Sequence, residues 1–94
     1  MKAKGEASKP WVSKGVTFPE GTEFRATYKG ALYTAAVSAG RLVVSGIGGS
    51  SSLSHAARLV TNTAVDGWAF WEAKRPADAG WLSAKSLRPA LKWI

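Results

Sequence analysis

The alternation of apolar and polar residues between Phe24 and Val44 constrains the fold of this chain more than any other feature. Residues 24–28 alternate and place Phe24, Ala26 and Tyr28 on one face, and residues 32–38 likewise place alternate residues from 33 to 37 on a common face, while residues 41–44 predict a third, short strand. A period of two is typical of strands with one buried face. Lys29-Gly30 and Ala39-Gly40 separate the runs and have the composition of tight turns. The segment therefore predicts a three-stranded antiparallel meander.

A meander of this size needs a cover for its apolar face, because two or three strands alone are only marginally stable. Residues 53–62 supply a helical pattern, with apolar residues at i, i+3, i+4 and i+7. The residues of this stripe are Leu53, Ala56, Ala57 and Val60. Either Ser51 or Ser52 can cap its first turn, and Asn62 is a typical helix stop.

The remaining segments complete the expected fold. Residues 68–72 predict a fourth strand after a turn at 65–67, and residues 82–87 predict a short helical turn capped by Ser83. Residues 45–51 are rich in glycine and serine and form either a flexible loop or a compact turn. The sequence thus predicts an α+β fold: a small antiparallel sheet, consisting of a three-stranded meander plus a fourth strand, packed on one main α-helix.

The domain organisation follows from length and composition. Ninety-four residues are enough for one domain, expected over residues 17–94. Residues 1–16 are expected to form a flexible basic arm, with Trp11 and Val12 able to dock on the body. Trp93-Ile94 is expected to pack as a C-terminal patch. The chain has no cysteine, no apolar signal-peptide core and no apolar stretch long enough to span a membrane, so we expect a cytoplasmic protein without a membrane partner.

Charge is the strongest functional signal. The formal net charge is +7 with a pI of about 10.2, a balance that favours an anionic partner such as nucleic acid or an acidic protein. Basic residues on the polar face and turns of the meander, on the predicted helix and after the fourth strand are candidates for phosphate contacts. They are Arg25, Lys29, Arg41, His55, Arg58, Lys74 and Arg75. The alternative interpretation is a solvated basic surface.

The chemistry of a catalytic or metal site is missing from the sequence. General acid–base catalysis uses titratable groups placed together, but His55 is the only histidine and the six carboxylates are scattered. One histidine without cysteine gives none of the usual zinc spacings. We therefore expect no enzyme, no cofactor, no metal and no small-molecule substrate.

The glycine- and serine-rich segment before the helix is a second candidate for phosphate contact. Residues 46–51 lack the Gly-Lys-Ser/Thr ending of a P-loop and the spacing of a dinucleotide fingerprint. The segment is either a structural turn or a contact to a nucleic-acid phosphate. Its candidate donors are Ser51, Ser52 and Ser54. Trp68 and Phe70 are assigned chiefly to the core.

Three segments in order resemble the RAMA domain, the small module associated with restriction enzymes and adenine methylases. They are residues 21–35, residues 51–57 with the pattern Ser-Ser-Leu-Ser-x-Ala-Ala, and residues 66–71 with the pattern Gly-Trp-x-Phe-Trp after Asp66. The resemblance covers about residues 20–72 and leaves 73–94 as a C-terminal extension. Related nuclease-associated domains share the serine-rich helix start and the Gly-Trp ending.

The resemblance implies a compact α+β module that helps DNA-modifying enzymes engage DNA, in some members with sensitivity to adenine methylation. The chain departs from the family pattern in two places. Asp66 stands where the family usually has asparagine, and residues 47–50 carry no aromatic before the helix. A pocket for a methylated base that is built on that aromatic would lack it here.

Charge and resemblance together predict a DNA-binding accessory module that engages double-stranded DNA mainly through its phosphates. The alternative is a protein-interaction adaptor that docks an acidic partner, such as a separate methylase or nuclease. A protein that mimics DNA is disfavoured because it should be acidic.

Overall fold

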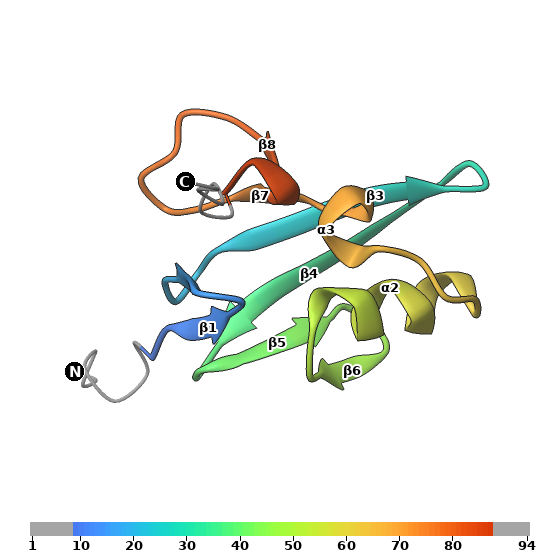
Figure 1. Cartoon of the computed structure of the whole chain (residues 1–94), viewed down its shortest axis with the longest axis horizontal. Coiled ribbons are helices and arrows are strands. Elements are labelled where there is room, and N and C mark those ends of the chain that lie inside the picture. The colour runs from blue at the N-terminus through green and yellow to red at the C-terminus, as the bar shows by residue number, and fades with distance from the viewer. Residues whose placement is uncertain (1–8, 88–94) are drawn as a thin grey trace, which may run out of the picture.

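The predicted meander forms the centre of the sheet in the computed structural model, which describes residues 9–87 (Figure 1). Its strands are β3 (Glu23–Tyr28), β4 (Ala31–Ser38) and β5 (Arg41–Val44). Three further strands extend it: β6 (Gly48–Ser50) pairs with β5, β7 (Glu72–Lys74) pairs with β3, and β8 (Leu82–Ser83) pairs with β7. The result is a six-stranded antiparallel sheet in the order β6-β5-β4-β3-β7-β8.

The strand register sorts the side chains onto two faces, as the alternation predicts. Phe24 lies opposite Ala35 and Ala73, and Val37 lies opposite Leu42. The inner face is the buried one, and its residues are Phe24, Ala26, Ala35, Val37, Leu42, Val44 and Ala73. The outer face carries Arg25, Thr34, Val43, Glu72 and Lys74, which alternate with them.

Four small elements share the cover of the inner face. They are helix α2 (Leu53–Thr61), the one-turn helix α3 (Gly67–Phe70), the hairpin of β1 (Trp11–Ser13) and β2 (Val16–Phe18), and the 3-10 turn η1 (Ala84–Leu87). The expected fold class, a four-stranded sheet on one main helix, is therefore wrong. The sheet has six strands, a second sheet has two, and α2 alone among the described helices exceeds six residues.

Residues 11–16 of the expected flexible arm belong to the hairpin, in which Trp11 packs on the body as expected whereas Val12 is exposed. Trp11 and Val16 are buried, and the Trp11 ring stacks on Phe18 with centroids 5.5 Å apart. Phe18 in turn contacts Phe24 and Trp68, so the hairpin supplies the aromatic centre of the core. Residues 1–8 of the expected arm lie outside the described residues. The strand β1 was missed because the lysines and Pro10 of this segment outweighed its two apolar residues.

Helix α2 follows the sequence prediction closely. Ser52 is its N-cap, and its Oγ accepts a hydrogen bond from His55 N at 3.0 Å. Asn62 ends it in the left-handed conformation with φ of 61°. Leu53, Ala56 and Ala57 are fully buried, which confirms the core side of the stripe.

The segment expected as the fourth strand begins instead as a helix. Asp66 caps α3, and its Oδ1 accepts from Trp68 N at 3.0 Å. The capping aspartate and the turn before it override the strand preference of the aromatics. The strand starts only at Glu72, so the prediction of a strand over residues 68–72 is wrong for all but its last residue.

The close contact between α2 and α3 depends on a glycine. A Cβ on Gly67 would overlap the carbonyl of Leu53 and the amide of Ser54. Two hydrogen bonds tie the same helices: Gly67 N donates to Ser54 Oγ at 3.0 Å, and the buried Trp71 Nε1 donates to Leu53 O at 3.1 Å. These contacts set the position of the start of α2.

Two other local expectations have different outcomes. In the glycine- and serine-rich segment, residues 45–47 form a turn, which is one of the two expected forms, whereas residues 48–50 form the edge strand β6. The helical turn expected over 82–87 forms from Ala84 as η1, after Leu82 and Ser83 pair as β8. The expected Trp93-Ile94 patch lies outside the described residues. In the part of the chain that is described, no helix is long and apolar enough to cross a membrane.

Candidate nucleic-acid interface

The ten predicted site residues do not form one cluster. Arg41 and the residues from Ser51 to Arg58 lie at the junction of β5, β6 and α2, whereas Arg25, Lys74 and Arg75 lie on or after β3 and β7. Lys29 lies in the turn between β3 and β4, at the opposite end of β4 from Arg41. Because β4 has eight residues at about 3.3 Å each, these two cations are separated by roughly 25 Å along the strand.

Two neighbours on the outer face contact the Arg25 side chain. Its Nε donates to Glu72 Oε1 at 2.7 Å, and its guanidinium lies 4.3 Å from the centroid of the Trp81 ring. Both charged side chains are about half exposed, so the ion pair adds little stability. The pair does place the Glu72 carboxylate against the Arg25 guanidinium, and this weakens the attraction of the guanidinium for a phosphate.

Arg75 is held even more completely by Asp78. Its Nε and Nη2 donate to the two carboxylate oxygens at 2.9 and 3.1 Å, and its backbone N donates to Oδ2 at 2.8 Å. The hydrogen bond from the guanidinium, with the backbone bond second, lowers the pKa of Asp78 below its usual value. The same side-chain hydrogen bond raises the pKa of Arg75. This arginine closes a loop and is a poor candidate for a phosphate contact.

The serines at the start of α2 have structural roles, of which the sequence predicted the helix cap but not the others. Ser52 caps the helix, and Ser54 Oγ accepts from Gly67 N. Ser50 Oγ lies 2.8 Å from Ser52 O and 2.9 Å from His55 Nδ1, and Ser51 N donates to the same Nδ1 at 3.4 Å. This network fixes the imidazole beside the end of β6 and leaves its Nε2 without a hydrogen bond to the described residues.

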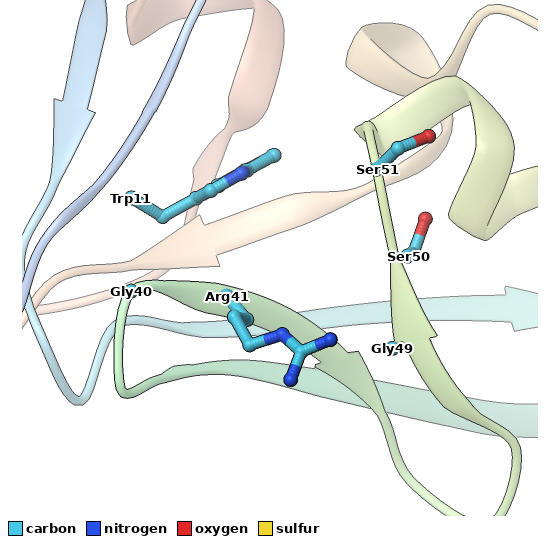
Figure 2. A pocket seen from close by; sticks show the side chains of 6 residues that line it. All are labelled: Trp11, Gly40, Arg41, Gly49, Ser50 and Ser51. Atoms are coloured by element: carbon cyan, nitrogen blue, oxygen red, sulfur yellow. The ribbon is translucent and has the colours of Figure 1, made fainter.

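A hollow of about 450 Å³ opens where β5 begins and β6 ends (Figure 2). Arg41 borders it together with Ser51, and the side chains of both are exposed. The other lining residues were not predicted: Trp11, Gly40, Gly49 and Ser50. Trp11 was missed because nothing in the sequence brings β1 next to the end of β6. Ser50 lies within the glycine- and serine-rich segment already flagged as a phosphate candidate.

A second hollow of about 200 Å³ lies along the exposed side of α2. Its lining residues are Ser54, His55, Arg58, Ala64 and Val65. The hydrogen bond between Ser50 and His55 connects this hollow to the first one. The five polar residues Arg41, Ser50, Ser51, His55 and Arg58 thus form one continuous strip, which we call the α2 surface.

The two arginines of the α2 surface differ from Arg25 and Arg75 in their carboxylate neighbours. Two ion pairs form among residues 9–87, Arg25–Glu72 and Arg75–Asp78, and neither includes Arg41 or Arg58. Glu20 is an acidic residue near this end of the sheet, and its Oε1 accepts from Ala39 N at 2.8 Å in the β4–β5 turn. A third hollow, of about 290 Å³ on the outer face, includes Glu23 and is less suited to an anion.

Metal ligation finds no support in the described residues, where no group of three or more histidine, cysteine, aspartate or glutamate side chains is close enough to hold an ion. Comparison with known proteins gave no match to a family model, to a curated protein or to a solved structure. The resemblance to the RAMA domain therefore stays a prediction, and the functional argument rests on the geometry and charge of the α2 surface.

Proposed function

We propose that this protein is a DNA-binding module that engages the phosphates of double-stranded DNA through the α2 surface. The observation that carries the proposal is the location of Arg41 and Arg58 on one continuous strip, outside the ion pairs that occupy Arg25 and Arg75. A net charge of +7 supports an anionic partner, and its attraction adds to the local contacts.

The side chains of the strip have the chemistry that phosphate oxygens require. The arginine guanidinium groups donate several hydrogen bonds at once, and serine hydroxyls add neutral donors between them. His55 adds a ring nitrogen at the surface, because its Nδ1 already contacts Ser50 and Ser51. Hydrogen bonds within β6 and the start of α2 hold Ser50 and His55 in place before a ligand binds, which reduces the entropy that these two side chains lose on binding.

This proposal narrows the set of contacts predicted from sequence. Arg41 and Arg58 are the principal cations, His55 supplies a ring nitrogen, Ser51 is an exposed donor, and Ser52 and Ser54 act mainly by shaping the helix start. Lys29 and Lys74 contribute to the general positive field. We propose a cytoplasmic location, which the absence of cysteine supports.

The test is a fluorescence anisotropy titration of a labelled duplex of about 20 base pairs at several salt concentrations. Each phosphate contact lowers log K by about 0.9 per unit of log salt, so the Arg41→Gln and Arg58→Gln variants should each reduce the slope by about that amount. Lys85→Gln is the matched control, since it removes the same charge from an exposed position on η1. An adenine-methylated copy of the duplex tests sensitivity to that modification.

Equal losses in all three variants would contradict the α2 surface, because binding would then follow total charge and not position. Absence of binding to any duplex at low salt would contradict the DNA-binding proposal itself. The protein-interaction adaptor would then be the function to pursue, with an acidic protein as its partner.

A further inference from the structure

The hollow beside Arg41 is larger than a phosphate contact requires. Its volume of about 450 Å³ lies within the range of about 300–1,000 Å³ that is typical of pockets for small organic molecules. A single phosphate group on Arg41 would leave most of this space to solvent. The hollow therefore has room for the base and sugar attached to that phosphate.

The lining of the hollow combines three kinds of contact. Figure 2 shows the Trp11 indole and the Arg41 side chain on one side, with Ser50 and Ser51 at the β6–α2 junction on the other. The indole supplies an apolar surface, the guanidinium supplies a cation, and the hydroxyls supply hydrogen-bond donors and acceptors. A nucleotide presents the matching groups: an aromatic base, a phosphate and polar base edges.

The edge strand adds backbone groups to this set. β6 is the last strand of the described sheet, so no further strand uses the N–H and C=O groups along its outer edge. Gly49 lines the hollow without a side chain, which leaves space at that position, whereas a Cβ on Gly40 would meet Lys9. Such an edge can hydrogen-bond a base, whose polar atoms lie in one plane.

We infer that the hollow formed by Trp11, Arg41, Ser50 and Ser51 accepts a single unpaired nucleotide. This inference rests on the proposed function. In an intact duplex the bases are stacked and paired, so only a nucleotide outside the stack can enter a hollow beside the backbone contacts. The protein should then prefer DNA that carries a bulged nucleotide to a fully paired duplex.

The expected preference is modest because Trp11 is only partly available. Its residue exposure is 8%, and Phe18 already stacks on it. A base can contact the remaining indole surface but cannot make a full stacking pair, which places the gain at the lower end of the stacking range, about fivefold to tenfold in affinity.

The experiment compares three labelled DNAs of one sequence: a fully paired duplex, the duplex with one bulged nucleotide, and the duplex with an abasic bulge. We expect wild-type protein to bind the base-bearing bulge about fivefold to tenfold more tightly than the other two. The abasic bulge separates recognition of the base from any preference for bent or flexible DNA.

Gly49→Phe is the variant that fills the hollow while keeping every charge. The backbone tolerates a side chain there, since a Cβ would have only Leu42 O within 4 Å, at 3.9 Å, and φ is not left-handed. The ratio of the affinities for the bulged and paired duplexes should fall to about 1. Gly80→Phe is the matched control, because nothing lies within 4 Å of a Cβ at that exposed position, and its ratio should equal that of wild type.

The outcomes separate the inference from the function on which it rests. Equal, salt-dependent binding of wild type to all three DNAs would overturn the nucleotide hollow and leave the phosphate-binding function intact. An unchanged preference in a folded Gly49→Phe variant would also overturn it. If circular dichroism shows that this variant does not fold, Gly49→Val provides the same comparison with a smaller side chain. No binding to any of the DNAs would refute the proposed function itself.

Discussion

The arginines on the β7–β8 side and on the β6–α2 side of the molecule differ in exposure and in their neighbours. On the β7–β8 side, Arg25 is paired with Glu72 and Trp81, and Arg75 is paired with Asp78. On the β6–α2 side, Arg41 and Arg58 border hollows and form no ion pair with the described residues. The difference teaches that a cation identified in a sequence becomes a candidate ligand-binding group only after its local carboxylates are known.

The largest expected difference between the two sides is in the free energy of unfolding. It comes from Gly67, the glycine that positions α2. Gly67→Ala should lower the free energy of unfolding by more than about 3 kcal/mol, because its Cβ would overlap the backbone at Leu53 and Ser54. Gly80→Ala on the other side of the sheet meets nothing within 4 Å and should change stability by less than about 0.5 kcal/mol. Urea denaturation of both variants measures the difference. Equal stabilities would mean that α2 and α3 do not pack this closely.

The next effect tests the hydrogen bond that ties α3 to the start of α2. Trp71→Phe leaves Leu53 O without its buried donor and opens a small cavity, so we expect a loss of about 2–4 kcal/mol. Trp81→Phe on the β8 side keeps an aromatic ring over Arg25, at a partly exposed position, and should cost under about 1 kcal/mol. Thermal denaturation of both variants gives the comparison. Similar losses would contradict the buried role of Trp71.

A smaller effect compares the arginines directly. Arg41→Gln should lower affinity for a 20-base-pair duplex about threefold to tenfold at low salt, since it removes one phosphate contact. Arg25→Gln should lower it less than about twofold, because Glu72 already faces that guanidinium. Anisotropy titrations at one fixed salt concentration distinguish the two. A larger loss at Arg25 would reverse the assignment of the binding side.

The smallest expected effect is on the pH dependence of stability, and it comes from the Arg75–Asp78 ion pair. The pKa of Asp78 is lowered in the folded protein, so its contribution to stability is present above its unfolded value of 3.8 and is lost as the pH falls through the folded value. Asp78→Asn should remove this part of the decline in melting temperature below about pH 4. A carbon-detected NMR titration of the Asp78 carboxyl measures the pKa directly, and a value at or above 3.8 would contradict the pairing.

Local sequence rules succeeded where neighbouring residues decide the structure. The alternation and tight turns of the meander from β3 to β5, the serine cap of α2 and its stop at Asn62 are each encoded within a few residues. The same rules misjudged β6, because a glycine- and serine-rich segment has weak local preference and becomes a strand only by pairing with β5. They misjudged α3 because one aspartate cap outweighed the strand preference of Trp68, Phe70 and Trp71.

Part of the candidate site was predicted from local sequence patterns, and the rest depends on segments that lie far apart in the sequence. Arg41, Ser51, His55 and Arg58 were identified from charge and from the pattern of the helix, and the structure brings them onto one strip. Trp11 and Ser50 were missed as lining residues, because their positions depend on strands that lie far apart in the sequence. The ion pair between Arg25 and Glu72 joins residues that are 47 positions apart, so no local sequence pattern predicts it.

The sequence by itself determined the strand pattern of residues 23–44, the helix pattern of residues 53–62, the positive charge and the residue types available to bind an anion. Tertiary structure decided which of those cations carry a neighbouring carboxylate, which serines are used as caps and where a hollow opens. The physical reason is the distance along the sequence over which each interaction acts. Alternation and capping act over one to four residues, whereas ion pairing and packing depend on segments that only the complete sheet brings together.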